Sequence, residues 1–68
     1  MKLKKLAVGQ RFCLNNRLDP ELNKWGTILD VGIGSVRVRF DKYKENNERG
    51  ELVEKKGYTT NIAPDTEV

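Results

Sequence analysis

Residues 25–41, WGTILDVGIGSVRVRFD, constrain the fold of this chain more than any other stretch. At 36–40, apolar residues alternate with arginines, which is the period-two pattern of a strand with one buried face and one solvent-exposed face. The preceding run, 26–31, is rich in the β-branched residues that favour strands. Because Gly32 and Gly34 separate the two runs, the stretch predicts a β-hairpin.

The turn chemistry of this hairpin predicts a register. A type II′ turn normally has glycine at its first central position, so Gly32 and Ile33 are the better pair of turn residues, with Gly32 at positive φ. Pairing outward from that turn predicts an inward face on which Leu29, Thr27 and Trp25 lie opposite Val36, Val38 and Phe40. The outward face would then hold Gly26, Ile28 and Asp30 together with Arg37 and Arg39.

The length of 68 residues predicts one domain, residues 1–68, of marginal stability, because a chain this short buries only about 60% of its unfolded surface. The only cysteine is Cys13 and there is no histidine, so no intrachain disulfide or Cys/His zinc site is expected. Cys13 is interpreted as a small strand residue. The sequence shows no secretory signal and no apolar run of membrane-spanning length, so we expect a cytoplasmic protein without a membrane partner.

The first part of the chain predicts one strand and one short helical turn. Residues 2–6, with three lysines and two leucines, are expected to be a solvated entry to a strand at 8–14. In that strand the alternation predicts Phe12 and Leu14 inward and Arg11 outward.

The next segment, RLDPELNKW, predicts a single 3₁₀ or α-helical turn within a long loop. Asp19 is the expected N-cap, because Pro20 suits the first helical position and an acidic residue suits the first turn. Either Leu18 or Leu22 is expected to pack back against the domain.

Residues 42–57 leave two alternatives open, a hairpin that begins its second strand near Glu51 or a mobile loop. Asn46, Asn47 and Gly50 are turn residues, so the tip is expected to be solvated and the base near Phe40 and Tyr58 to be ordered. Residues 58–60 resume strand character after Gly57, which marks a bulge or a strand start. Ile62 is expected inward, Pro64 ends the strand, and 65–68 add a brief last strand.

These elements resemble the SH3-like small barrels of the Tudor and KOW type. The opening strand of those barrels is similar to VGQRF at 8–12. Their central pattern, G-x-V-x-x-V-x-x-G-x-V-x-V-x-F, is similar to WGTILDVGIGSVRVRFD at 25–41. Their closing strand and one-turn helix are similar to YTTNIAP at 58–64. The loops RLDPELNK and KENNERGELVEKKG have no counterpart there. The resemblance implies an all-β fold, a small bent antiparallel barrel of four to five strands, and it does not transfer functional residues.

Two classes of function fit the residues. The first is a small non-enzymatic protein-interaction module, an adaptor or inhibitor acting through its two charged loops, of a size and composition like those of phage and mobile-element accessory proteins. Aromatic residues favour interface hot spots, so the candidate partner-binding residues are Trp25, Tyr43 and Tyr58. For Trp25 the register favours the alternative of a core residue beside Phe40. An aromatic cage for methylated lysine needs three or four rings and has only Trp25 and Tyr43 placed for it, so no cage is expected.

The alternative is weak, sequence-independent binding of nucleic acid through an outward basic stripe that follows the phosphate backbone. Its candidate residues are Arg11, Arg37, Arg39, Lys42 and Lys44. Net charge is only +3, from 13 basic and 10 acidic residues, so charge alone does not indicate nucleic acid. No catalytic constellation or phosphate-binding glycine loop is present, so we expect no enzymatic activity, no cofactor and no metal, and we leave homo-oligomerisation open.

Overall fold

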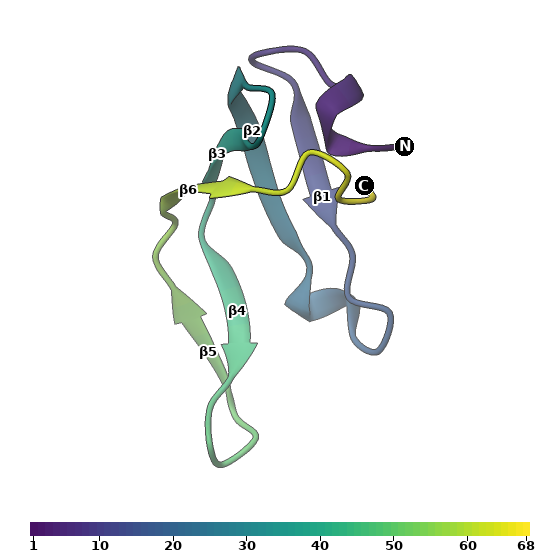
Figure 1. The fold of residues 1–68 in the computed structure, drawn as a ribbon. Coiled ribbons are helices and arrows are strands. Elements are labelled where there is room, and N and C mark those ends of the chain that lie inside the picture. Colours follow the sequence, from purple (N-terminus) through teal and green to yellow (C-terminus); the bar gives the residue numbers. More distant parts are fainter.

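The computed structural model describes residues 1–68, and it is built from strands and two 3₁₀ turns (Figure 1). In chain order the elements are η1 (Leu3–Lys5), β1 (Arg11–Leu14), η2 (Pro20–Leu22), β2 (Lys24–Val31), β3 (Val36–Phe40), β4 (Tyr43–Asn46), β5 (Leu52–Lys55) and β6 (Thr59–Ile62). The prediction of an all-β protein is confirmed.

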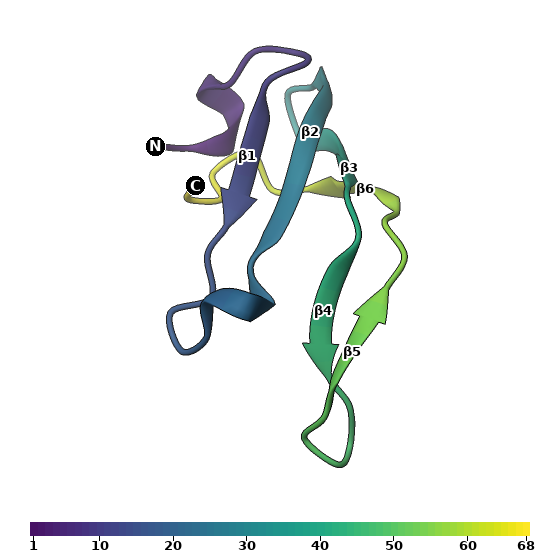
Figure 2. The same cartoon turned by 180° about the vertical axis from the view of Figure 1, so that it is seen from behind.

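The strands form two antiparallel sheets, and neither is closed into a barrel. The larger sheet has the order β1-β2-β3-β6, and β4 pairs with β5 in a separate hairpin that projects from it (Figure 1). In Figure 1, β6 crosses in front of β2, whereas Figure 2, seen from behind, presents β1 and β2 toward the viewer. The larger sheet is therefore strongly bent. Its concave side holds the core and its outer side is convex.

Seven residues form the hydrophobic core, and they come from the N-terminal turn and from β1, β2 and β3. The core residues are Leu3, Leu6, Phe12, Ile28, Val36, Val38 and Phe40. Leu14, Ile62 and Val68 pack against this cluster and are partly buried. The inward positions predicted for Phe12, Leu14 and Ile62 and for the alternating residues of β3 are confirmed.

The N-terminal segment is part of the core, so the prediction of a solvated entry is wrong for its two leucines. Leu3 is fully buried and Leu6 nearly so, while the neighbouring lysines remain exposed. The Leu3 amide donates to the Thr66 carbonyl at 2.8 Å, and Lys2 forms an isolated β-bridge with Glu67. These contacts hold the first turn against the last residues of the chain. The strand also starts later than predicted, at Arg11.

The inward face of β2 differs from the predicted one. Gly26 lies opposite both Phe12 and Phe40, and Ile28 is fully buried opposite Val38. A Cβ at Gly26 would stand 2.7 Å from a ring carbon of Phe12, so the absence of a side chain makes room for that ring. The predicted register would instead place the Trp25 side chain at this inward position, where the rings of Phe12 and Phe40 already meet.

The turn between β2 and β3 has four residues, 32–35, with Val31 opposite Val36. The Gly32 amide donates to the Ser35 carbonyl at 2.9 Å. Gly32 does not have positive φ, so the predicted type II′ turn is wrong. The longer turn moves the partner of Val36 by two residues, from the predicted Leu29 to Val31. The irregularity between Ile28 and Asp30 reduces this shift to one residue, so that Val38 pairs with Ile28 instead of Thr27.

The first charged loop contains the predicted helical turn. The Asp19 carboxylate accepts a hydrogen bond from the Glu21 amide at 3.0 Å and caps η2, as its position before Pro20 predicts. Leu22 is the half-buried leucine, and Leu18 is 96% exposed.

The second charged loop is a hairpin rather than an irregular loop. At its tip the Asn47 amide donates to the Glu51 carbonyl at 2.9 Å, and the Asn47 side-chain oxygen accepts from the Arg49 and Glu51 amides at 2.9 and 3.0 Å. None of the residues of β4 and β5 is fully buried. The expectation of a solvated tip is confirmed, and so is the start of the second strand near Glu51.

The chain ends add a pH-dependent contribution to stability. The Asp65 carboxylate forms two ion pairs. Its Oδ1 atom lies 3.0 Å from the Lys4 ammonium and 3.5 Å from the Lys2 ammonium. The hydrogen bond from Lys4, followed by the charge of Lys2, lowers the pKa of the Asp65 carboxyl below its usual range. Since the pKa is lower in the folded state, this contribution is present above pH of about 4 and is lost as the pH falls through the folded pKa.

We therefore expect the thermal midpoints of the wild type and the Asp65→Asn variant to differ near neutral pH and to converge at about pH 2. Asp30→Asn is the matched control, because Asp30 is exposed and takes part in no ion pair. The thermal midpoint of Asp30→Asn should equal that of the wild type at both pH values. A constant difference between wild type and Asp65→Asn across the titration would contradict this assignment.

Candidate nucleic-acid interface

The convex side of the larger sheet carries a set of polar, basic and aromatic side chains that we call the outer face. Registered pairs place Arg11, Thr27, Arg39 and Thr59 opposite one another in β1, β2, β3 and β6, so they form one row across the sheet. A second, parallel row joins Asp30, Arg37 and Asn61. The outer face comprises these residues together with Trp25.

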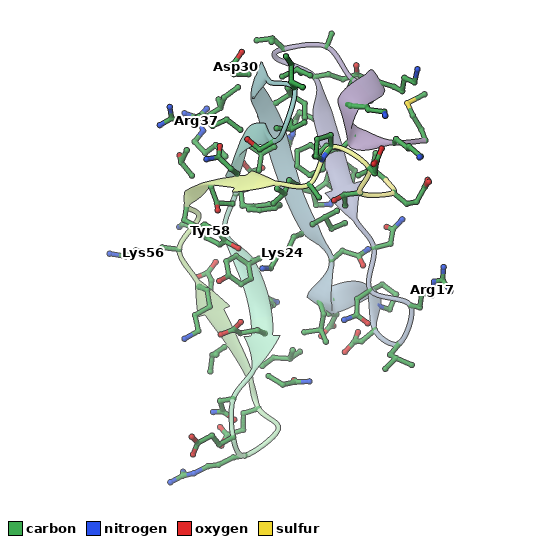
Figure 3. All side chains as sticks on the ribbon, viewed as in Figure 1. Arg17, Lys24, Asp30, Arg37, Lys56 and Tyr58 are labelled. Carbon is green, nitrogen blue, oxygen red and sulfur yellow. The ribbon has the colours of Figure 1, made fainter.

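Arg37 and Arg39 are the basic groups of the outer face that take part in no ion pair, and Asp30, the acidic group of this face, lies opposite Arg37. Both are exposed, as predicted, and neither has a carboxylate within 4.0 Å. Figure 3 shows Arg37 extending away from the body of the molecule. They are two residues apart on one strand face, so their Cα atoms lie about 7 Å apart. Two guanidinium groups are thus presented side by side to solvent.

Arg11 belongs to the same face but is already partnered. Its guanidinium forms an ion pair with Asp41 and lies 5.5 Å from the centre of the Trp25 ring. The pair is solvent-exposed, so it contributes at most about 1 kcal/mol to stability. Its main effect is to orient Arg11 along the sheet and to neutralise part of its charge.

Trp25 lies on the outer face, which corrects its predicted place in the core. Its residue partner in β1 is Cys13, on the outward side, and it is 50% exposed. The reason is the register described above, in which Gly26 occupies the inward position. The alternative interpretation, an exposed aromatic anchor, is therefore the one that fits its position.

The remaining predicted site residues lie outside the outer face. Lys42 and Lys44 are exposed, but Lys42 follows the end of β3 and Lys44 lies on the projecting hairpin opposite Glu54. Tyr43 is half-buried and Tyr58 is 40% exposed. The structure thus joins three of the five predicted basic residues to Trp25 and separates the other two.

The two tyrosines belong to an aromatic cluster that the sequence analysis missed. Ring centres of Phe12 and Phe40 are 5.9 Å apart, those of Phe40 and Tyr58 are 5.3 Å apart, and those of Tyr58 and Tyr43 are 5.9 Å apart. The chain of rings runs from the core to the base of the hairpin. No sequence periodicity relates these four residues, so only the tertiary fold brings them together.

Lys24 occupies the open side of this cluster. Its ammonium lies 4.3 Å from the ring centre of Tyr43 and 5.4 Å from those of Phe40 and Tyr58. It also contacts the Tyr58 hydroxyl at 3.2 Å, and Figure 3 shows the two side chains meeting. Three rings therefore surround the chain's own lysine in a cage that the sequence did not predict; of the two residues considered for a cage, Tyr43 belongs to it and Trp25 does not. Because Lys24 starts β2, this contact ties the hairpin to the larger sheet.

Replacing Lys24 by methionine is expected to lower the free energy of unfolding by about 0.5–2 kcal/mol, because the side chain keeps its length but loses its cation–π contacts. Chemical denaturation measures this difference. Lys44→Met is the control, since Lys44 is exposed on β4 and contacts no ring. Equal stabilities of the two variants would show that the cage contributes nothing.

The structure contains no group of three or more His, Cys, Asp or Glu side chains that could hold a metal ion. Its one surface depression is at the hairpin tip and is lined by polar residues, Asn47, Glu48, Arg49 and Glu51. Neither 3₁₀ turn approaches the length or apolarity of a membrane-crossing helix.

Comparison of the chain with protein-family models, with curated proteins and with solved structures found no match. The SH3-like resemblance accordingly stays a prediction from the residues.

Proposed function

We propose that this protein is a small non-enzymatic binding module that holds nucleic acid by its phosphate backbone on the outer face. The observation that carries the proposal is the pair Arg37 and Arg39, exposed and unpaired beside the exposed Trp25 on the convex side of the sheet. Guanidinium groups match phosphate oxygens in a two-pronged geometry, and an aromatic ring adds a stacking surface.

Binding of this kind is electrostatic and independent of sequence. Contacts to phosphates release condensed counterions, so affinity falls as salt rises, with a slope that grows with the number of phosphates contacted. They carry no information about the bases. With two free arginines and a third that is partly neutralised, we expect weak affinity and a shallow salt dependence.

The fold proposed for this module is an open variant of the SH3-like small barrel. Support comes from the antiparallel order β1-β2-β3-β6, from the strong bend of that sheet, and from the β-bridge between Lys2 and Glu67 that joins the first and last segments. A cytoplasmic location is part of the proposal, because the only cysteine, Cys13, is a free thiol and reducing compartments preserve thiols.

The experiment is to titrate labelled DNA and RNA with nuclease-treated protein at about 50 and 200 mM salt. Replacing both Arg37 and Arg39 by alanine is expected to weaken binding at least tenfold for every sequence and to reduce the log–log salt slope by roughly 2. Thermal denaturation should be unchanged, because both side chains are exposed and contact no partner.

The matched control also removes two positive charges, but from arginines that lie outside the outer face. Arg17 lies in the first charged loop and Arg49 at the hairpin tip, and both are exposed without an ion pair. The Arg17→Ala/Arg49→Ala variant should retain most of the affinity. An equal loss in both double variants would mean that net charge, not the outer face, determines binding, and no binding at low salt would reject the proposal.

A protein partner is the second candidate, and the projecting hairpin favours it. Residues 42–56 carry five basic and four acidic side chains, a mixed pattern suited to a complementary charged surface. Tyr58, at the hairpin base, remains 40% exposed. A stoichiometric partner recovered after nuclease treatment, and lost on replacing Tyr43 or Tyr58 in a variant that keeps the stability of the wild type, would support this function instead.

A further inference from the structure

We infer that the outer face selects single-stranded over double-stranded nucleic acid, with one base stacked on Trp25. This inference rests on the proposed function and adds the class of ligand to it. Four observations carry it: the curvature of the sheet, the composition of the hairpin, the position of Trp25 and the polar groups beside the arginines.

The convex shape of the outer face disfavours a duplex. Double-stranded DNA is stiff, with a persistence length of about 50 nm, so it touches a small convex surface only along a short line. The larger sheet turns so far that β6 crosses β2 (Figure 1). Arg11 and Arg37, on strands at different positions around this bend, cannot both reach a straight duplex easily. A flexible single strand can follow the curve.

No element of the protein is suited to entering a duplex groove. The major groove admits an α-helix or a two-stranded ribbon. The helical turns have three residues each, and the one ribbon, β4–β5, is nearly neutral in charge. Lys55 on this ribbon is also paired with Glu45 at 3.6 Å. The basic groups of the outer face and the only groove-sized element thus lie on different parts of the molecule.

Trp25 is placed to receive a base from a strand that follows β3. Arg37 and Arg39 succeed each other along β3, and the Asp41 amide that comes next donates to the Trp25 carbonyl at 2.8 Å. Phosphates held by the two arginines therefore lead directly to the exposed indole on the adjacent strand. A duplex hides the faces of its bases, whereas a single strand offers them for stacking.

Polar groups beside these residues suit an unpaired strand. Thr27 lies opposite Arg39 in β2, and Thr59 lies opposite it in β6. Asn61 lies opposite Arg37. Their hydroxyl and amide groups supply hydrogen bonds to sugars and to base edges that are free only in a single strand.

Trp25 is the only tryptophan, so its fluorescence reports directly on the proposed stack. The probe is an oligothymidine of about 12 nucleotides, compared with a duplex of the same length, at about 50 mM salt. We expect the single strand to quench the fluorescence and to bind roughly tenfold more tightly than the duplex.

Variants separate stacking from charge, with binding followed by anisotropy of the labelled oligonucleotide. Trp25→Leu is expected to lower single-strand affinity roughly tenfold, leave duplex affinity and the salt slope unchanged, and so remove the preference. Trp25→Phe, which keeps a ring, should retain most of it. Thermal denaturation of both variants excludes misfolding as the cause.

The outcomes distinguish the inference from the function on which it rests. If duplex binds as tightly as single strand, or if Trp25→Leu binds like the wild type while Arg37→Ala/Arg39→Ala does not bind, the inference is wrong and nucleic-acid binding stands. If neither nucleic acid binds at low salt, both fall. Quenching together with loss of the preference in Trp25→Leu supports both.

Discussion

Replacing Gly57 by alanine is expected to lower the free energy of unfolding by about 3 kcal/mol or more. A Cβ at this position would lie 2.0 Å from the carbonyl oxygen of Phe40 and 3.0 Å from the carbonyl carbon of Asp41. Both are backbone atoms, and the Phe40 amide is held to the Tyr58 carbonyl at 2.8 Å. The two segments cannot separate without losing that hydrogen bond.

The expected consequence for Gly57→Ala is the loss of roughly a third or more of the total stability, because a domain of this size has only about 3–10 kcal/mol in total. Circular dichroism with thermal and urea denaturation measures it. Gly34→Ala is the control, since a Cβ there meets nothing within 4 Å and its φ is not positive. That variant should match or slightly exceed the wild type. Equal stability of the two variants would contradict the close approach at Gly57.

Replacing Leu3 by alanine is expected to cost about 2–5 kcal/mol. Leu3 is fully buried in the core, although it lies in a three-residue 3₁₀ turn with lysines on both sides. Its removal would leave a cavity next to the concave side of the sheet. It would also weaken the contact between the first turn and the end of the chain, which the Leu3 amide helps to form.

The same substitution at Leu18 serves as the control for Leu3→Ala. Leu18 is 96% exposed, so Leu18→Ala should change stability by no more than about 0.5 kcal/mol. Denaturant midpoints of the two variants give the comparison directly. If Leu3→Ala were as mild as Leu18→Ala, the N-terminal turn would not be packed as described.

Features with a local cause could be predicted from the sequence. The alternation in β3 places its arginines outward and its apolar residues inward, and the structure has both. The cap at Asp19 also depends only on its neighbours, and it forms as expected. The outward position of Arg11 follows from the same period-two pattern in β1. The sequence therefore predicts the outward positions of all three arginines of the candidate site.

Features set by packing between distant residues could not be predicted. The register of β2 depends on Gly26, whose missing side chain admits the ring of Phe12 from another strand. That register moves Trp25 from the core to the outer face. The cage around Lys24 needs rings from three other parts of the chain. No turn preference or periodicity encodes such contacts.

The contact of Lys24 with the aromatic cluster has a consequence for local opening of the structure. None of the hairpin residues in β4 and β5 is fully buried, so little apolar surface opposes their detachment. The side-chain contacts across the junction include those of Tyr43 with Lys24 and with Tyr58. The hairpin is thus a separate cooperative unit that opens at a lower free energy than the larger sheet. The amide hydrogens of the hairpin should exchange with solvent before those of the larger sheet. A protease that cuts between Asn47 and Gly50 should leave the larger sheet folded, and with it the positions of Arg37 and Arg39.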